Sequence, residues 1–217
     1  KKFLIRIVEN NDWVTAIVIG GLLIITLVYV YLNREVSLKE YLTQDVGDAS
    51  NVFLTWTIMS IVFFVQMTVL MSQYIPSVPK VVEDIQIGGY QLNKFGYLFG
   101  VISLFYLVKT VLSFFFYASI NQIQNYQNQY FVASRFYFCY IIVLIILIFI
   151  NYYIGINKRY FLLILLAFNA IMFLFKLILY LFHKNKILPN QWYYKFLYIC
   201  TLQIAPLYAL WRLLFYN

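Results

Sequence analysis

The sequence predicts an all-α fold, an integral membrane bundle of about six transmembrane helices. Hydrophobic residues make up 64% of the 217 residues and charged residues only 11%, whereas soluble domains contain roughly 45–50% and about 25%. The apolar residues form six long runs, each with the roughly 20 residues that cross a hydrocarbon core about 30 Å thick. Tyrosine and tryptophan, such as Tyr126 and Tyr130, gather at the ends of these runs, where amphipathic rings favour the headgroup region.

Each run is expected to form one helix of a single domain that covers residues 1–217. The first run is too long for the apolar core of a signal peptide, so we interpret it as a retained helix. The other five have similar lengths and lack the strict alternation of barrel strands, which excludes an outer-membrane barrel. In chain order, the expected spans are Trp13–Leu32, Val52–Ser72, Tyr97–Ala118, Phe131–Ile154, Tyr160–Phe182 and Trp192–Leu214.

Local patterns add detail to three of these helices and their connections. Pro206 lies inside the last span, removes one amide donor and is expected to kink that helix. The stretch Asn121–Gln129, between the third and fourth spans, is polar but uncharged, and we expect a solvated loop there. Gly20 and Gly21 in the first span favour the close approach of another helix.

The formal net charge of +8 does not indicate nucleic-acid binding, because the basic residues are scattered between apolar runs and form no stripe. Anchoring at the membrane surface and contacts to anionic lipid headgroups of the bilayer explain them better. The acidic residues are distributed unevenly. All eight Asp and Glu residues lie within the first 84 positions, so the rest of the chain carries ten Lys and Arg residues and no carboxylate.

Two lysines inside the predicted spans are the leading candidates for a site, because an ionisable side chain costs about 2.5–3.5 kcal/mol in the bilayer on insertion scales. Lys109 lies near the middle of the third span, and Lys176 lies nearer the end of the fifth. Snorkelling towards the headgroups is the structural alternative, and it suits Lys176 better than Lys109. No predicted span contains Asp or Glu. The partner is therefore a carbonyl, an Asn or Gln side chain, an anionic lipid or ligand, or a carboxylate of another subunit, and we favour the last two.

Uncharged polar residues complete the candidate set. Gln66, Asn169 and Gln203 lie in the second, fifth and sixth spans, where interhelical hydrogen bonds worth about 0.6 kcal/mol are the commoner role of such residues. A helix break at Pro206 beside Gln203 either lines a cavity or serves packing. The candidates for ligand or partner binding are thus Lys109, Lys176, Gln66, Asn169, Gln203 and Pro206.

Residue patterns for catalysis are missing from the sequence. His183 is the sole histidine and lies at a helix end, where interfacial placement or helix capping explains it better than catalysis. Cys139 and Cys200 both fall in apolar runs without CxxC spacing, which favours packing over a disulfide or a metal site. We predict no catalytic residue, no metal and no cofactor, and enzymatic activity is not indicated.

Two segments resemble a known family. The last span contains Phe196-Leu-Tyr-Ile-Cys-Thr-Leu-Gln-Ile-Ala-Pro206-Leu, and Asn11-Asp-Trp-Val-Thr15 leads into the first run. Both resemble an uncharacterised family, a domain of unknown function in multi-pass membrane proteins, chiefly of Bacteroidetes-type bacteria. The resemblance implies a location in the inner membrane of a diderm bacterium and supplies no activity. A Glu often precedes the proline by three positions in that family, where this chain has Gln203, which puts in doubt any role that needs a carboxylate there.

Two functions are compatible with these observations. The first is a non-enzymatic multi-pass subunit or assembly factor of the bacterial cell envelope, which binds another membrane protein in a complex. The alternative is a binder or transporter of an anionic, lipid-like small molecule, held in an intramembrane basic cavity. The two hypotheses place Lys109 differently. If the protein binds a partner, Lys109 faces the exterior of the bundle, where another helix docks. If it binds an anionic small molecule, Lys109 faces a closed internal pocket.

Overall fold

A computed structural model describes residues 11–32, 40–41, 46–48, 51–75, 86–87, 90–91, 93–154, 157–184 and 187–215. Six helices in this part of the chain are long and apolar enough to cross a membrane. They confirm the predicted all-α bundle of a multi-pass membrane protein. The spans are Asp12–Tyr31, Val52–Met71, Lys94–Ser119, Ile123–Tyr153, Lys158–Phe182 and Trp192–Phe215.

Some spans combine more than one type of helix. The first consists of α1 (Asp12–Leu27) and the π-helical η1 (Val28–Leu32), and the last consists of α8 (Trp192–Leu197), the π-helical η3 (Tyr198–Ile204) and α9 (Ala205–Phe215). The other four spans are α3 (Val52–Met71), α5 (Lys94–Ser119), α6 (Ile123–Tyr153) and α7 (Lys158–Phe182). Between spans lie the 3₁₀-helix η2 (Val46–Asp48) and a short antiparallel pair, β1 (Gln86–Ile87) and β2 (Tyr90–Gln91).

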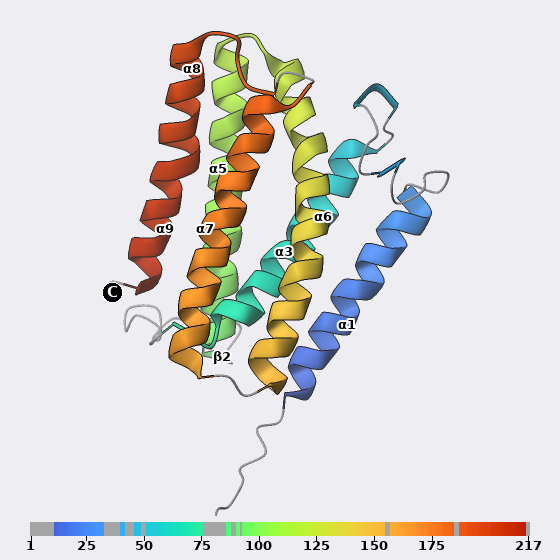
Figure 1. The fold of residues 1–217 in the computed structure, drawn as a ribbon, viewed down its shortest axis with the longest axis vertical. Coiled ribbons are helices and arrows are strands. Elements are labelled where there is room, and N and C mark those ends of the chain that lie inside the picture. Colours follow the sequence, from blue (N-terminus) through green and yellow to red (C-terminus); the bar gives the residue numbers. More distant parts are fainter. Residues whose placement is uncertain are drawn as a thin grey trace, which may run out of the picture.

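The bundle has α3 and α6 at its centre. In the 18-residue apolar stretch of each helix, 50% of the residues of α6 and 44% of those of α3 are buried inside the bundle, against 6% of those of α7. In Figure 1, α3 crosses the other helices obliquely, with α1 along one side and α8 and α9 along the opposite side. The outer surface is apolar, and Leu104 and Ile171 are each 63% exposed. Such a surface matches hydrocarbon as the surrounding solvent.

The connection between α5 and α6 is a tight turn. Asn121 ends α5 in the left-handed conformation with φ 56°. The N–H of Asn121 donates to the carbonyl of Ala118, and that of Gln122 donates to the carbonyl of Tyr117, the two bonds of a Schellman motif. Helix α6 then begins at Ile123. The prediction of a loop over Asn121–Gln129 is therefore wrong for residues 123–129, which form the first turns of a 31-residue helix.

The last span changes its hydrogen-bond pattern just before Pro206. In η3 the helix is π-helical, and the N–H of Ala205 donates to the carbonyl of Cys200, five residues earlier. Proline has no N–H to continue a regular helical ladder, and a π-helical turn is one way to accommodate it. The kink predicted at Pro206 stays a prediction, and what the structure shows there is this change of helix type.

Candidate functional site

A partly open pocket of about 40 Å³ lies among α3, α5, α6, α7 and the last span. Three of the predicted site residues line it, Lys109 from α5, Lys176 from α7 and Gln203 from η3. We call it the lysine pocket. The remaining walls are mostly aromatic or hydroxyl-bearing side chains, among them Trp56, Ser113, Tyr126, Tyr130, Tyr137 and Tyr180.

Lys109 begins a hydrogen-bonded chain that joins three helices. Its Nζ donates to Oε1 of Gln203 at 2.6 Å, and the Gln203 side chain is only 1% exposed. Nε2 of Gln203 donates to the hydroxyl of Tyr198 at 2.9 Å, and Nε2 of Gln129 donates to the same hydroxyl at 2.7 Å. Lys109 therefore points into the bundle, towards a polar network that links α5, η3 and α6.

The π-helical segment brings Gln203 and Tyr198 together. These residues are five positions apart, which in a regular α-helix of 3.6 residues per turn would place them roughly 140° apart around the axis. In a π-helix the repeat of the hydrogen bonds is five residues, so such a pair lies on one face. The 2.9 Å bond between their side chains depends on this local geometry.

Lys176 lies in an aromatic cage. Its side chain is 9% exposed, and its Nζ donates to the hydroxyl of Tyr137 at 3.2 Å. The same Nζ lies 4.8 Å from the ring centroid of Tyr137, 5.5 Å from that of Phe136 and 5.6 Å from that of Tyr180. A desolvated cation–π contact contributes about 2 kcal/mol or more, so the cage stabilises the Lys176 ammonium form without supplying a carboxylate.

Two basic side chains and no carboxylate line the described walls of the lysine pocket. Neither Lys109 nor Lys176 pairs with a carboxylate among the described residues, and each amine donates one hydrogen bond there. An ammonium group has three donors, so each lysine retains two for another group. Two like charges in one pocket of low dielectric also repel each other.

The remaining predicted residues lie elsewhere. The Gln66 side chain is fully buried between α3 and α1, where its Nε2 donates to the carbonyl of Ile17 at 3.2 Å. Asn169 joins α7 to α6, because its Oδ1 accepts a hydrogen bond from the hydroxyl of Tyr140. Pro206 follows η3 and does not line the lysine pocket. The structure thus brings Lys109, Lys176 and Gln203 together and separates Gln66 and Asn169 from them.

Several residues of the pocket and of the hydrogen-bond network next to it were not predicted from the sequence. Tyr126 and Tyr130 were assigned to the membrane interface, yet both line the lysine pocket, and Tyr126 is only 5% exposed. Tyr137 and Tyr198 lie inside apolar runs, where a tyrosine is not distinguished from a packing residue. The signal that was present is the spacing of Tyr198, Gln203 and Pro206, since a proline favours a local change in the hydrogen-bond register of the helix.

Comparison with known proteins supports the resemblance noted in the sequence. Neither a curated protein nor a solved structure matches the chain. Residues 14–214 match the family described as "Domain of unknown function (DUF4271)". This match includes all the residues that line the lysine pocket. The chain therefore belongs to the DUF4271 family of domains of unknown function.

Proposed function

We propose that this multi-pass membrane protein binds a small anion in the lysine pocket. The observation that carries the proposal is that Lys109 and Lys176 line one pocket whose described walls contain no carboxylate. Two desolvated ammonium groups without a counterion are costly. An anion between them replaces their repulsion with two attractions and accepts the hydrogen bonds that the amines have left to donate.

The volume of the pocket limits the size of the ligand. About 40 Å³ is far below the roughly 300–1,000 Å³ of pockets that enclose a drug-sized ligand. A halide ion or a single carboxylate group is of this size, whereas an acyl chain is not. The sequence suggests a lipid-like anionic ligand as an alternative. The volume of the pocket restricts the bound part of such a ligand to a compact anionic group.

The orientation of Lys109 favours this function over the docking of a partner at that residue. Its amine bonds to the buried side chain of Gln203, whereas a docking lysine would face the exterior of the bundle. A membrane-protein partner, a role in cell-envelope assembly and an inner-membrane location remain predictions from the sequence.

Iodide quenching of Trp56 tests the proposal, because Trp56 lines the lysine pocket and iodide is both an anion and a quencher of tryptophan fluorescence. Replacing the other three tryptophans, Trp13, Trp192 and Trp211, with phenylalanine leaves Trp56 as the single reporter. In nanodiscs we expect saturable quenching by iodide that chloride relieves competitively.

Removing one ammonium group should weaken this binding selectively. Lys109→Met is expected to raise the apparent Kd for iodide by about tenfold or more, because a hydrogen bond to a charged group contributes about 1.5–3 kcal/mol. Quenching by neutral acrylamide should not change. Lys158→Met is the matched control, because Lys158 is exposed at the start of α7 and does not line the pocket. Linear, non-saturable iodide quenching that is equal in Lys109→Met and the parent protein would refute the proposal.

A further inference from the structure

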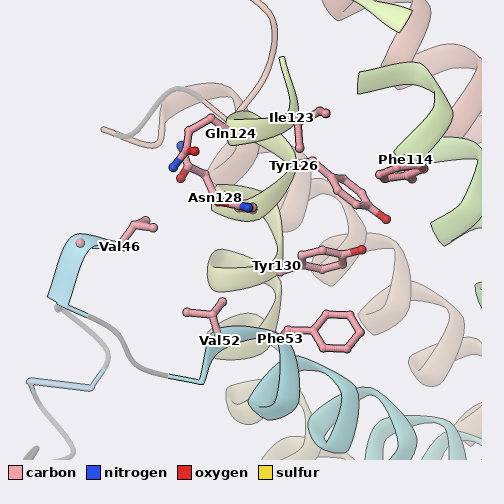
Figure 2. A pocket seen from close by; sticks show the side chains of 11 residues that line it. Val46, Val52, Phe53, Phe114, Ile123, Gln124, Tyr126, Asn128 and Tyr130 are labelled. Atoms are coloured by element: carbon pink, nitrogen blue, oxygen red, sulfur yellow. The ribbon is translucent and has the colours of Figure 1, made fainter. Parts of the chain in front are cut away.

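A groove of about 900 Å³ lies beside the lysine pocket and is lined by the first turns of α6, by Phe114 of α5, by the start of α3 and by Val46 and Gly47 of η2. Three uncharged amide side chains, Gln124, Gln127 and Asn128, contribute to its lining, and we call it the amide groove. Figure 2 shows Gln124 and Asn128 on one side of α6, and the rings of Tyr126 and Tyr130 on the other. These amides belong to the polar stretch for which the proposed function has no role.

The amide groove and the lysine pocket share a wall. Tyr126 and Tyr130 line both of them. Their ring centroids are 4.4 Å apart, and the ring of Trp56 lies 4.2 Å from that of Tyr130. The hydroxyl of Tyr126 donates to the carbonyl of Thr110 at 2.9 Å, which fixes that ring next to Lys109. Tyr130 is the less buried of the two shared rings, so its displacement is the smallest change that could join the two spaces.

The groove lies at one end of the bundle, and the lysines lie deeper along the same direction. The end of α5, the start of α6 and the end of α7 are all at this end in Figure 1. At about 1.5 Å per helical residue, Lys109 lies about 15 Å along α5 from Ser119, and Lys176 lies about 9 Å along α7 from Phe182. The path from groove to pocket therefore runs from a membrane face towards the membrane interior.

The lining of the groove suits an ion that arrives from water. The exposed side chains of Gln124 and Gln127 present N–H donors beside apolar residues such as Phe53. None of the described lining side chains is a carboxylate that would repel an anion. A lipid that brought its anionic group to the lysines through this groove would leave its acyl chain at the aqueous face, against the hydrophobic effect. A water-soluble ion meets no such penalty.

We infer that the amide groove is the aqueous entrance to the lysine pocket, that its ligand is a small water-soluble anion, and that Tyr130 separates the two spaces. This inference rests on the proposed function. The inference adds two points to the proposed function. The ligand enters from one side of the membrane, and the site prefers water-soluble ions to amphiphiles.

A fixed charge placed in the groove tests the inference. In the Trp56-only protein with Cys139 and Cys200 replaced by alanine, Gln127→Cys offers a single thiol at an exposed position of the groove. Modification with anionic sulfonatoethyl methanethiosulfonate should slow iodide quenching of Trp56 in stopped-flow measurements by about tenfold, because charge in a cleft changes ionic on-rates by about 10- to 1,000-fold. The cationic trimethylammonium reagent of similar size should not slow it.

Two further variants keep the result interpretable. Lys158→Cys carries the same modification on an exposed residue at the other end of the bundle and should leave the quenching rate unchanged. Gln124→Cys provides a second exposed position in the groove if Gln127→Cys does not fold, and Tyr130→Ala should accelerate quenching.

The outcomes separate the entrance from the site itself. Equal quenching rates for both reagents at Gln127 and Gln124, with iodide binding still weakened in Lys109→Met, would overturn the entrance and leave the anion site intact. Unchanged iodide binding in Lys109→Met would instead overturn the site. Faster iodide access with the cationic than with the anionic label, at the groove positions alone, is the result we expect.

Discussion

Adding one methyl group at Gly21 is expected to disturb the contact between α1 and α3, whereas the same change at the adjacent Gly20 is not. A Cβ atom at Gly21 would lie 2.2 Å from Nε2 of Gln66 and 3.6 Å from Cγ1 of Val62. A Cβ atom at Gly20 would meet nothing within 4 Å. The two variants thus have the same composition and the same helix, and they differ only in the face that receives the methyl group.

The expected magnitudes follow from this geometry. Both Gly→Ala changes gain roughly 0.5–1 kcal/mol of helix stability. At Gly21 the amide of Gln66 must also rotate away and lose its 3.2 Å bond to the carbonyl of Ile17. Interhelical hydrogen bonds in membranes contribute about 0.6 kcal/mol on average and up to about 1.7 kcal/mol. We therefore expect Gly20→Ala to stabilise the protein and Gly21→Ala to be less stable than Gly20→Ala by about 1 kcal/mol.

Reversible unfolding in mixed micelles of increasing SDS content measures these differences. The double-mutant cycle with Gln66→Ala isolates the contact, because in that background the methyl group at position 21 has room. There Gly21→Ala should be as stabilising as Gly20→Ala. If Gly21→Ala already stabilises the protein fully with Gln66 present, the packing of α1 on α3 described above is wrong. The assignment of Gln66 to a structural role would fall with it.

Two further changes test the turn before α6 and the charge of the lysine pocket. Asn121→Ala should destabilise the protein by about 1 kcal/mol, because alanine is unfavourable in the left-handed conformation that Asn121 adopts. Asn121→Gly should have little effect in the same SDS assay, and equal stability of the two variants would contradict the turn. Gln203→Glu places a carboxylate where Oε1 of Gln203 accepts from Lys109 at 2.6 Å, so it should abolish saturable iodide quenching of Trp56. Retained iodide affinity in Gln203→Glu would show that Lys109 does not act as a cation in that pocket.

The number and type of the spans followed from the sequence because hydrocarbon imposes a simple rule. A backbone inside it must satisfy its own hydrogen bonds, so a long apolar run is a helix. The rule says little about where helices continue beyond the hydrocarbon. Helix α6 begins at Ile123, eight residues before the predicted start at Phe131, because apolarity marks the hydrocarbon boundary and amide side chains do not end a helix.

The site was predictable only in part. Lys109 and Lys176 stood out because a charge in the bilayer is costly, but their meeting in one pocket depends on how α5 and α7 are rotated against α6. In a helix that is apolar on all sides, the sequence does not fix that rotation. The roles of Tyr137 and Tyr198 were not predictable for a related reason. A tyrosine serves equally well in packing, at an interface or as a hydrogen-bond partner.

In the proposed function, the identity of Gln203 as the partner of Lys109 decides which ligand the pocket attracts. A carboxylate at the same position would accept the same hydrogen bond and cancel the charge, which would make the site a closed ion pair. The amide of Gln203 holds the ammonium group in place through a 2.6 Å bond and leaves its charge unbalanced. The aromatic cage does the same for Lys176. Because no carboxylate follows residue 84 in the sequence, the helices that form most of the pocket contain no competing acid. Under the proposed function, this positioning of both lysines without a carboxylate is what favours an external anion over an internal one.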